Sequence, residues 1–180
     1  MLALMKVFVD IVFWRKGPQD LPASTLLLAV CVAAVLGLNL AIAGVREAFM
    51  PPDPLAPQSQ FLYAIIEPAL VLGWLWLLLA LFRRPGRFRQ SATALMGIGL
   101  VLSPVLLGSS LVAVRVGQDS RVAWSLAAGV VVVVSVWYLL AVAHILRSAL
   151  ETRLFPAIVL TLVFMTGVWF VQVGLFGASA

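Results

Sequence analysis

The chain has 180 residues, of which 63% are hydrophobic and 11% are charged, and its formal net charge is +5. A soluble domain has about 45–50% apolar and about 25% charged residues, so this composition excludes a water-soluble globular fold. The basic residues lie between apolar runs, as in membrane proteins, and form no stripe for nucleic acid, which we exclude as a partner. One cysteine and one histidine cannot supply the ligands of a structural zinc site.

Residues 1–16 form the first predicted element. The segment is mostly apolar and too short to span a bilayer, while Lys6 and Asp10 share one helix face four residues apart. Trp14 and the Arg15-Lys16 pair follow as interfacial anchors. We predict a cytoplasmic amphipathic helix lying in the membrane interface, ahead of a span domain at residues 17–180.

Five apolar runs of span length follow. A helix that crosses the hydrocarbon needs about 20 apolar residues, and open strands would leave backbone groups unsatisfied in lipid. The runs cover approximately residues 21–44, 62–82, 91–114, 122–146 and 155–177. We therefore predict an all-α polytopic membrane bundle of five transmembrane helices, preceded by a short amphipathic interfacial helix.

A cleavable signal peptide is the alternative interpretation of the first run. Ala41-Ile42-Ala43 before Gly44 resembles a small-residue cleavage site. The region ahead of the apolar run would then be about 20 residues long, and the run itself has the length of a span. Both features favour a membrane span.

The basic residues predict the orientation of the bundle. With a cytoplasmic N-terminus, the opposite side receives three basic residues, Arg46, Arg115 and Arg121, and the cytoplasmic side receives nine: Lys6, Arg15, Lys16, Arg83, Arg84, Arg87, Arg89, Arg147 and Arg153. This is a positive-inside distribution, and it places the C-terminus in the periplasm. Short loops and a composition rich in arginine and alanine indicate a bacterial inner membrane.

Small residues recur at every fourth position of the first span, at Ala29, Ala33, Gly37 and Ala41. Such rows let helix backbones approach closely in membranes. We expect this row to pack against another helix of the same chain, with a dimer face as the alternative. In the third span, Pro104 removes a backbone hydrogen bond and should kink the helix.

Polar side chains are predicted to gather around Glu67, about five residues inside the second span. An acidic residue at membrane depth is costly unless it is protonated or paired, so it marks a candidate site. Antiparallel threading places four other polar residues near the same depth: Asn39, Ser109, Ser110 and Gln172. The cluster either fixes the register of the helices or lines a polar cavity that carries a proton, a cation or a partner contact.

The sequence contains no motif for catalysis or cofactor binding. GxxxxGK[ST], GxGxxG, HExxH and GxSxG are all missing, and the loop carboxylates are spread over both predicted sides. We therefore predict that the protein is not an enzyme and has no catalytic, cofactor-binding or metal-binding residues. The densest charged group is basic, and we expect it to contact anionic lipids or an acidic partner. It consists of Arg83, Arg84, Arg87 and Arg89.

Three short segments carry a resemblance to a known family. Gly17-Pro18-Gln19-Asp20-Leu21-Pro22 precedes the first span, Arg84-Pro85-Gly86-Arg87-Phe88-Arg89-Gln90 leads into the third, and Ser103-Pro104 lies within it. With the five-span layout, they resemble the Yip family of small membrane proteins, in its compact bacterial form. The resemblance implies an all-α five-span fold and a role in membrane organisation or trafficking without catalysis. Eukaryotic members bind small prenylated GTPases, but their long acidic N-terminal region has no counterpart before the first span here.

Together these features predict a non-enzymatic protein that scaffolds or helps assemble a larger membrane complex through helix contacts. Its expected partners are membrane lipids and other membrane protein subunits, or further copies of itself. The alternative is a small transporter or channel-like protein with a polar site around Glu67 near the outer leaflet. Against transport, five spans cannot divide into two equal repeats of the kind that many transporters use.

Overall fold

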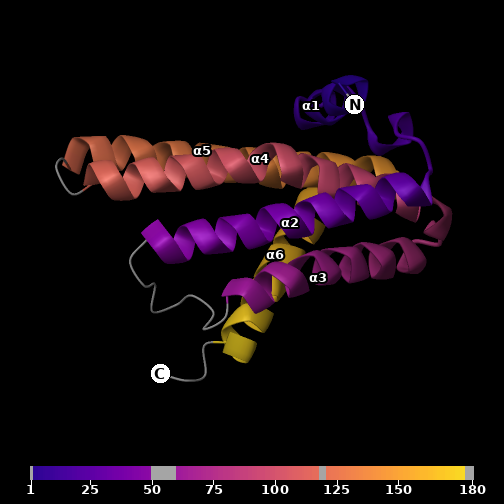
Figure 1. Ribbon diagram of the computed structural model, residues 1–180. Helices are drawn as coiled ribbons and strands as arrows, with labels where there is room; N and C mark the ends of the chain where they lie inside the picture. Colours follow the sequence, from indigo (N-terminus) through magenta and orange to yellow (C-terminus); the bar gives the residue numbers. More distant parts are fainter. Residues whose placement is uncertain (1, 50–59, 118–120, 177–180) are drawn as a thin grey trace.

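The computed structural model describes residues 2–49, 60–117 and 121–176, and within these ranges the regular structure is helical (Figure 1). The elements are α1 (Leu2–Val12), η1 (Pro18–Asp20), α2 (Thr25–Phe49), α3 (Gln60–Leu81), η2 (Pro85–Arg87), α4 (Phe88–Gly117), α5 (Arg121–Leu150) and α6 (Leu154–Phe176). By length and composition, α2 to α6 can each cross a membrane. The predicted all-α, five-span fold is confirmed, and the chain is an integral membrane protein.

The first span begins four residues later than the apolar run. Leu21 is buried but lies outside the helix, because Pro18 begins a single turn of 3-10 helix at η1 and Pro22 follows this turn. Ser24 then caps α2, since its Oγ accepts a hydrogen bond from the Leu27 backbone N–H at 3.2 Å. Hydropathy does not detect a helix cap, which explains why the predicted start of the span lies four residues before the start of α2.

Helix α4 lies at the centre of the bundle. It runs antiparallel beside α5, and it also packs on α1, α2 and α3. All eight residues from 91 to 98 are buried, whereas most described residues in the distal half of the α4–α5 hairpin are partly or fully exposed. This part of the hairpin projects past the end of α2 (Figure 1). The protein core is therefore concentrated at one end of the bundle. We call this the basic end, because its arginines are Arg83, Arg84, Arg87, Arg89, Arg147 and Arg153.

Three helices end with the same turn. Trp14, Arg83 and Glu151 follow α1, α3 and α5 with φ of 58°, 57° and 53°. In each turn a backbone N–H bonds five residues back, as in a Schellman cap: Arg15 to Asp10 at 2.8 Å, Arg84 to Leu79 at 2.7 Å and Thr152 to Arg147 at 3.2 Å. A left-handed non-glycine residue costs about 1–2 kcal/mol, so side-chain contacts must offset this cost.

The amphipathic helix α1 packs against the spans. Its residues Phe8, Ile11 and Val12 are buried in the same core as residues of α4 and α5. The indole N–H of Trp137 donates to the Val12 carbonyl at 3.0 Å, and the ring of Trp14 stacks on Trp137 with centroids 5.4 Å apart. The ring contact explains how Trp14 is held in its unusual backbone conformation.

A glycine on α4 makes room for the docked helix. A Cβ atom built on Gly97 would lie 2.2 Å from two ring carbons of Phe8, which is far inside van der Waals contact. By contrast, a Cβ built on Gly99 would meet no atom within 4 Å. Gly97 is thus the floor of the Phe8 site, and the chain offers a matched control two residues away.

We predict that Gly97→Ala lowers the free energy of unfolding by about 1–3 kcal/mol, because the added methyl group overpacks the Phe8 site. Gly99→Ala should not destabilise the protein. Unfolding by sodium dodecyl sulfate in mild micelles measures both, and trypsin cleavage after Arg15 or Lys16 reports release of α1. In a Phe8→Ala background, Gly97→Ala should lose its effect; an equal effect in both backgrounds would contradict this packing.

Candidate functional site

A polar pair joins α2 and α3 inside the bundle. The side-chain amide of Asn39 donates to Glu67 Oε2 at 3.3 Å and to the Ala64 carbonyl at 3.4 Å. Asn39 comes 14 residues after the start of α2 at Thr25, and Glu67 comes 14 residues before the end of α3 at Leu81. At 1.5 Å per residue, both side chains lie about 21 Å from the basic end, which is well inside the membrane.

Pro68 explains why an amide is needed at this point. Proline has no backbone N–H, so the carbonyl four residues earlier, at Ala64, loses its partner in α3. An unsatisfied carbonyl in hydrocarbon is costly, and Asn39 supplies the missing donor. The side chain of Asn39 therefore donates hydrogen bonds both to the unpaired Ala64 carbonyl and to the carboxyl group of Glu67.

The structure assembles only part of the predicted polar cluster. Ser109 and Ser110 each donate to the carbonyl four residues back in α4, at 2.8 Å, and not to Glu67. Gln172 lies in α6, but its side chain is outside the described residues. The sequence reasoning missed Tyr138 of α5, which is partly buried and within electrostatic range of Glu67. The sequence did contain a sign of this residue, because Tyr138 carries a polar hydroxyl within an otherwise apolar span.

The small-residue row of α2 faces away from the other described helices. Ala29, Ala33, Gly37 and Ala41 are all exposed, and a Cβ built on Gly37 would meet no atom within 4 Å. The expectation that this row packs within the chain is wrong. The opposite face of α2, which carries Cys31, Val35 and Asn39, is turned inward to meet α3 and α4. Pro104 is also exposed, and α4 continues through it as one helix.

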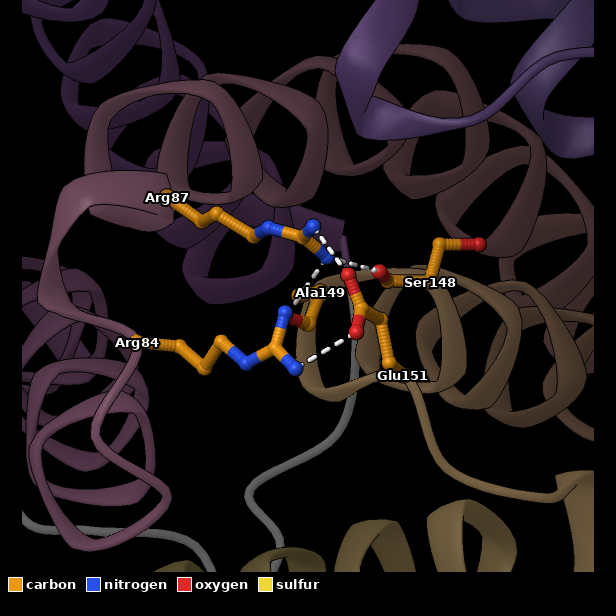
Figure 2. Close-up of polar contacts among 5 residues, drawn as sticks. All are labelled: Arg84, Arg87, Ser148, Ala149 and Glu151. Atoms are coloured by element: carbon orange, nitrogen blue, oxygen red, sulfur yellow. Dashed lines mark hydrogen bonds and ion pairs between the residues drawn. The ribbon is translucent and has the colours of Figure 1, made fainter.

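An ion cluster closes the basic end (Figure 2). Arg87 of η2 donates to the Ser148 and Ala149 carbonyls at 3.0 and 3.3 Å, which caps the C-terminus of α5. Its guanidinium also pairs with Glu151, and Arg84 reaches the second carboxylate oxygen of Glu151 at 2.5 Å. The α3–α4 connection is thereby tied to the α5–α6 turn.

The four predicted arginines therefore have two different environments. Arg84 and Arg87 are half-buried and bound to Glu151, whereas Arg83 and Arg89 are exposed. Arg89 approaches Thr25 at the start of α2, with Nη1 and Oγ1 3.5 Å apart. Glu151 was not expected to take part, because loop carboxylates far apart in sequence give no sign of their partners.

Comparison with protein-family models, with curated proteins and with solved structures found no match to this chain. Within the described ranges, no three side chains of His, Cys, Asp or Glu gather closely enough to hold a metal ion. The candidate functional features are therefore the Asn39–Glu67 pair, the open row on α2 and the ion cluster of the basic end.

We predict that Asn39 and Glu67 are coupled energetically. A double-mutant cycle with Asn39→Ala and Glu67→Ala, measured as the free energy of unfolding in micelles, should give about 0.6–1.7 kcal/mol of coupling, as for other interhelical hydrogen bonds in membranes. Asn39→Ala also leaves the Ala64 carbonyl without a hydrogen-bond donor. It should therefore lower the free energy of unfolding by more than the coupling energy alone. Strictly additive effects would show that the two side chains do not interact.

The ion cluster should make stability depend on pH in the acid range. Hydrogen bonds from Arg84 and then Arg87 hold the pKa of Glu151 below its ordinary value. The carboxylate contribution is complete above the unfolded pKa of about 4.3 and is lost as pH falls through the lower folded pKa. Thermal midpoints measured downward from neutral pH should therefore fall less steeply in Glu151→Gln. A parallel decline in both proteins below about pH 4 would contradict this assignment.

Proposed function

We propose that this chain is a non-enzymatic membrane protein that organises or helps assemble a larger membrane complex through helix contacts. The observation that supports this proposal is the open row of small residues on α2, at Ala29, Ala33, Gly37 and Ala41. The row extends over 13 residues, with about 18 Å of helix between its first and last members, on a face that no other described helix covers.

The physics of helix association in lipid favours this interpretation. Lipid tails are as apolar as leucine, so helices associate by close packing rather than by the hydrophobic effect. A groove of small residues allows the backbone of a second helix to come close, and exposed Leu26, Val30 and Leu40 provide larger side chains near it. A partner helix with a complementary ridge would bury this groove.

The orientation and the family belong to the same proposal. A cytoplasmic basic end and a periplasmic C-terminus follow from the positive-inside rule, and a bacterial inner membrane follows from the composition. The resemblance to the Yip family supports a role in membrane organisation. On this proposal the partners are other membrane proteins or further copies of the chain.

Transport is the second candidate, and the Asn39–Glu67 pair is the observation that favours it. A carboxyl group inside a span is a common feature of ion and proton pathways. Its support is weaker, because Ser109 and Ser110 bond to their own helix and Asn39 already has a structural partner in the Ala64 carbonyl.

We predict that Gly37→Phe abolishes association, because the ring fills the groove that a partner backbone would enter. Val132→Phe is the matched control, since Val132 is exposed on α5, a different helix from the one that carries the row. Both proteins should fold alike. Purification from native membranes in mild detergent, with mass spectrometry of all proteins retained at a fixed ratio, measures the loss.

The outcomes separate the two candidates. A membrane partner, or a second copy, retained by the wild type and Val132→Phe but lost from Gly37→Phe supports assembly through α2. Recovery of the wild type as a monomer without partners would contradict the proposal. Flux measured in liposomes with Glu67→Gln would then become the deciding experiment.

A further inference from the structure

A pocket lies at the basic end beside the ion cluster. Its volume is about 430 Å³, and it is bounded by the first turn of α4, the η1 turn and the end of α5. Gln19 and Glu151 at its rim are exposed, whereas Ser91 on its wall is 1% exposed. The pocket therefore opens at the surface and narrows toward α4.

The side chain of Ser91 indicates that the pocket binds a ligand. Its hydroxyl is buried and has no hydrogen-bond partner among the residues that the structure describes. On the same helix, Thr93, Ser109 and Ser110 donate to the carbonyl four residues back. Ser91 does not make this bond, although leaving a buried hydroxyl unpaired is costly. Ser91 is among the residues that line the pocket, so a rotation of its side chain can offer this hydroxyl to an acceptor that enters there.

The other groups around Ser91 favour an anion. Arg87 uses three of its five N–H groups for Ser148, Ala149 and Glu151, which leaves two for a ligand. The first turn of α4 adds the positive end of a 30-residue helix. Among the described residues that line the pocket, Glu151 is the one carboxylate, and both of its oxygens are already paired with arginine.

The position of the pocket points to phosphate. The apolar stretches of α3 and α5 end at Leu81 and Leu150, and those of α4 and α6 begin at Pro85 and Leu154, so the pocket lies at the ends of these candidate spans. This is the depth at which the phosphate groups of a bilayer lie. Segments 83–90 and 147–153 bring six arginines and one carboxylate to this level.

We propose that this pocket binds a phosphate group, held by Arg87, the Ser91 hydroxyl and the amide of Gln19. The phosphate comes either from a phospholipid headgroup or from solution. A tetrahedral oxyanion has enough acceptor positions for all three donors, and charge-assisted hydrogen bonds are the strong ones. This site is separate from the row on α2, so each proposal can fail without the other.

The test uses the full chain, delipidated in maltoside micelles, which contain no phosphate. The thermal midpoint is measured with added phosphatidylglycerol, phosphatidylethanolamine or inorganic phosphate, and with diacylglycerol of the same acyl chains as the phosphate-free control. Ser91→Ala removes a hydroxyl that has no protein partner, so it should fold as well as the wild type. We expect it to weaken phospholipid binding about tenfold, through loss of one charge-assisted hydrogen bond.

Two further variants keep the result interpretable. Gln19→Glu places a negative charge at the exposed rim and should weaken binding at least as much, while Ser109→Ala, a distant serine of α4, should bind as the wild type does. Stabilisation by phospholipid but not diacylglycerol, lost in the pocket variants, supports a headgroup site. Stabilisation by inorganic phosphate alone, lost in the same variants, supports the site with a soluble source. Equal effects of diacylglycerol and phospholipid, or full binding by Ser91→Ala and Gln19→Glu, would overturn the proposal.

Discussion

Every backbone polar group in the hydrocarbon must find its partner within the protein, and the fold depends on this constraint. It makes the apolar runs helical, including the β-branched run from Val130 to Val134 in α5. In α3, Pro68 leaves the Ala64 carbonyl without a backbone donor. The side-chain amide of Asn39 in α2 supplies the missing hydrogen bond. That bond sets α2 and α3 at the same depth, and it fixes which side of α2 turns inward.

The two ends of the bundle differ in how they are held. At the basic end, α1 docks on α4 and α5, Arg87 caps α5, and the Gln90 side chain binds the Leu21 carbonyl at 2.8 Å. Toward the other end, α4 and α5 run on as a hairpin with many exposed apolar side chains (Figure 1). Each has 30 residues, about 45 Å, which exceeds a hydrocarbon thickness of about 30 Å, so an untilted helix of this length extends beyond the hydrocarbon.

The proposed functions use different parts of this arrangement. The groove on α2 faces lipid along the length of a span, where close backbone approach is the available driving force. The phosphate pocket lies at the basic end, where arginines and a helix N-terminus provide positive charge. One surface is suited to a protein partner and the other to a headgroup.

The sequence by itself determined the fold class and the number of spans, because apolar length is a property of the local chain. It also placed Asn39 and Glu67 at one level, and the structure joins them. The Glu151 ion cluster, the Phe8 site over Gly97 and the unpaired Ser91 hydroxyl came only from the tertiary structure. So did the outward direction of the Ala29–Ala41 row. Spacing tells which residues share a face of a helix, but the rotation of that helix about its axis is set by its neighbours.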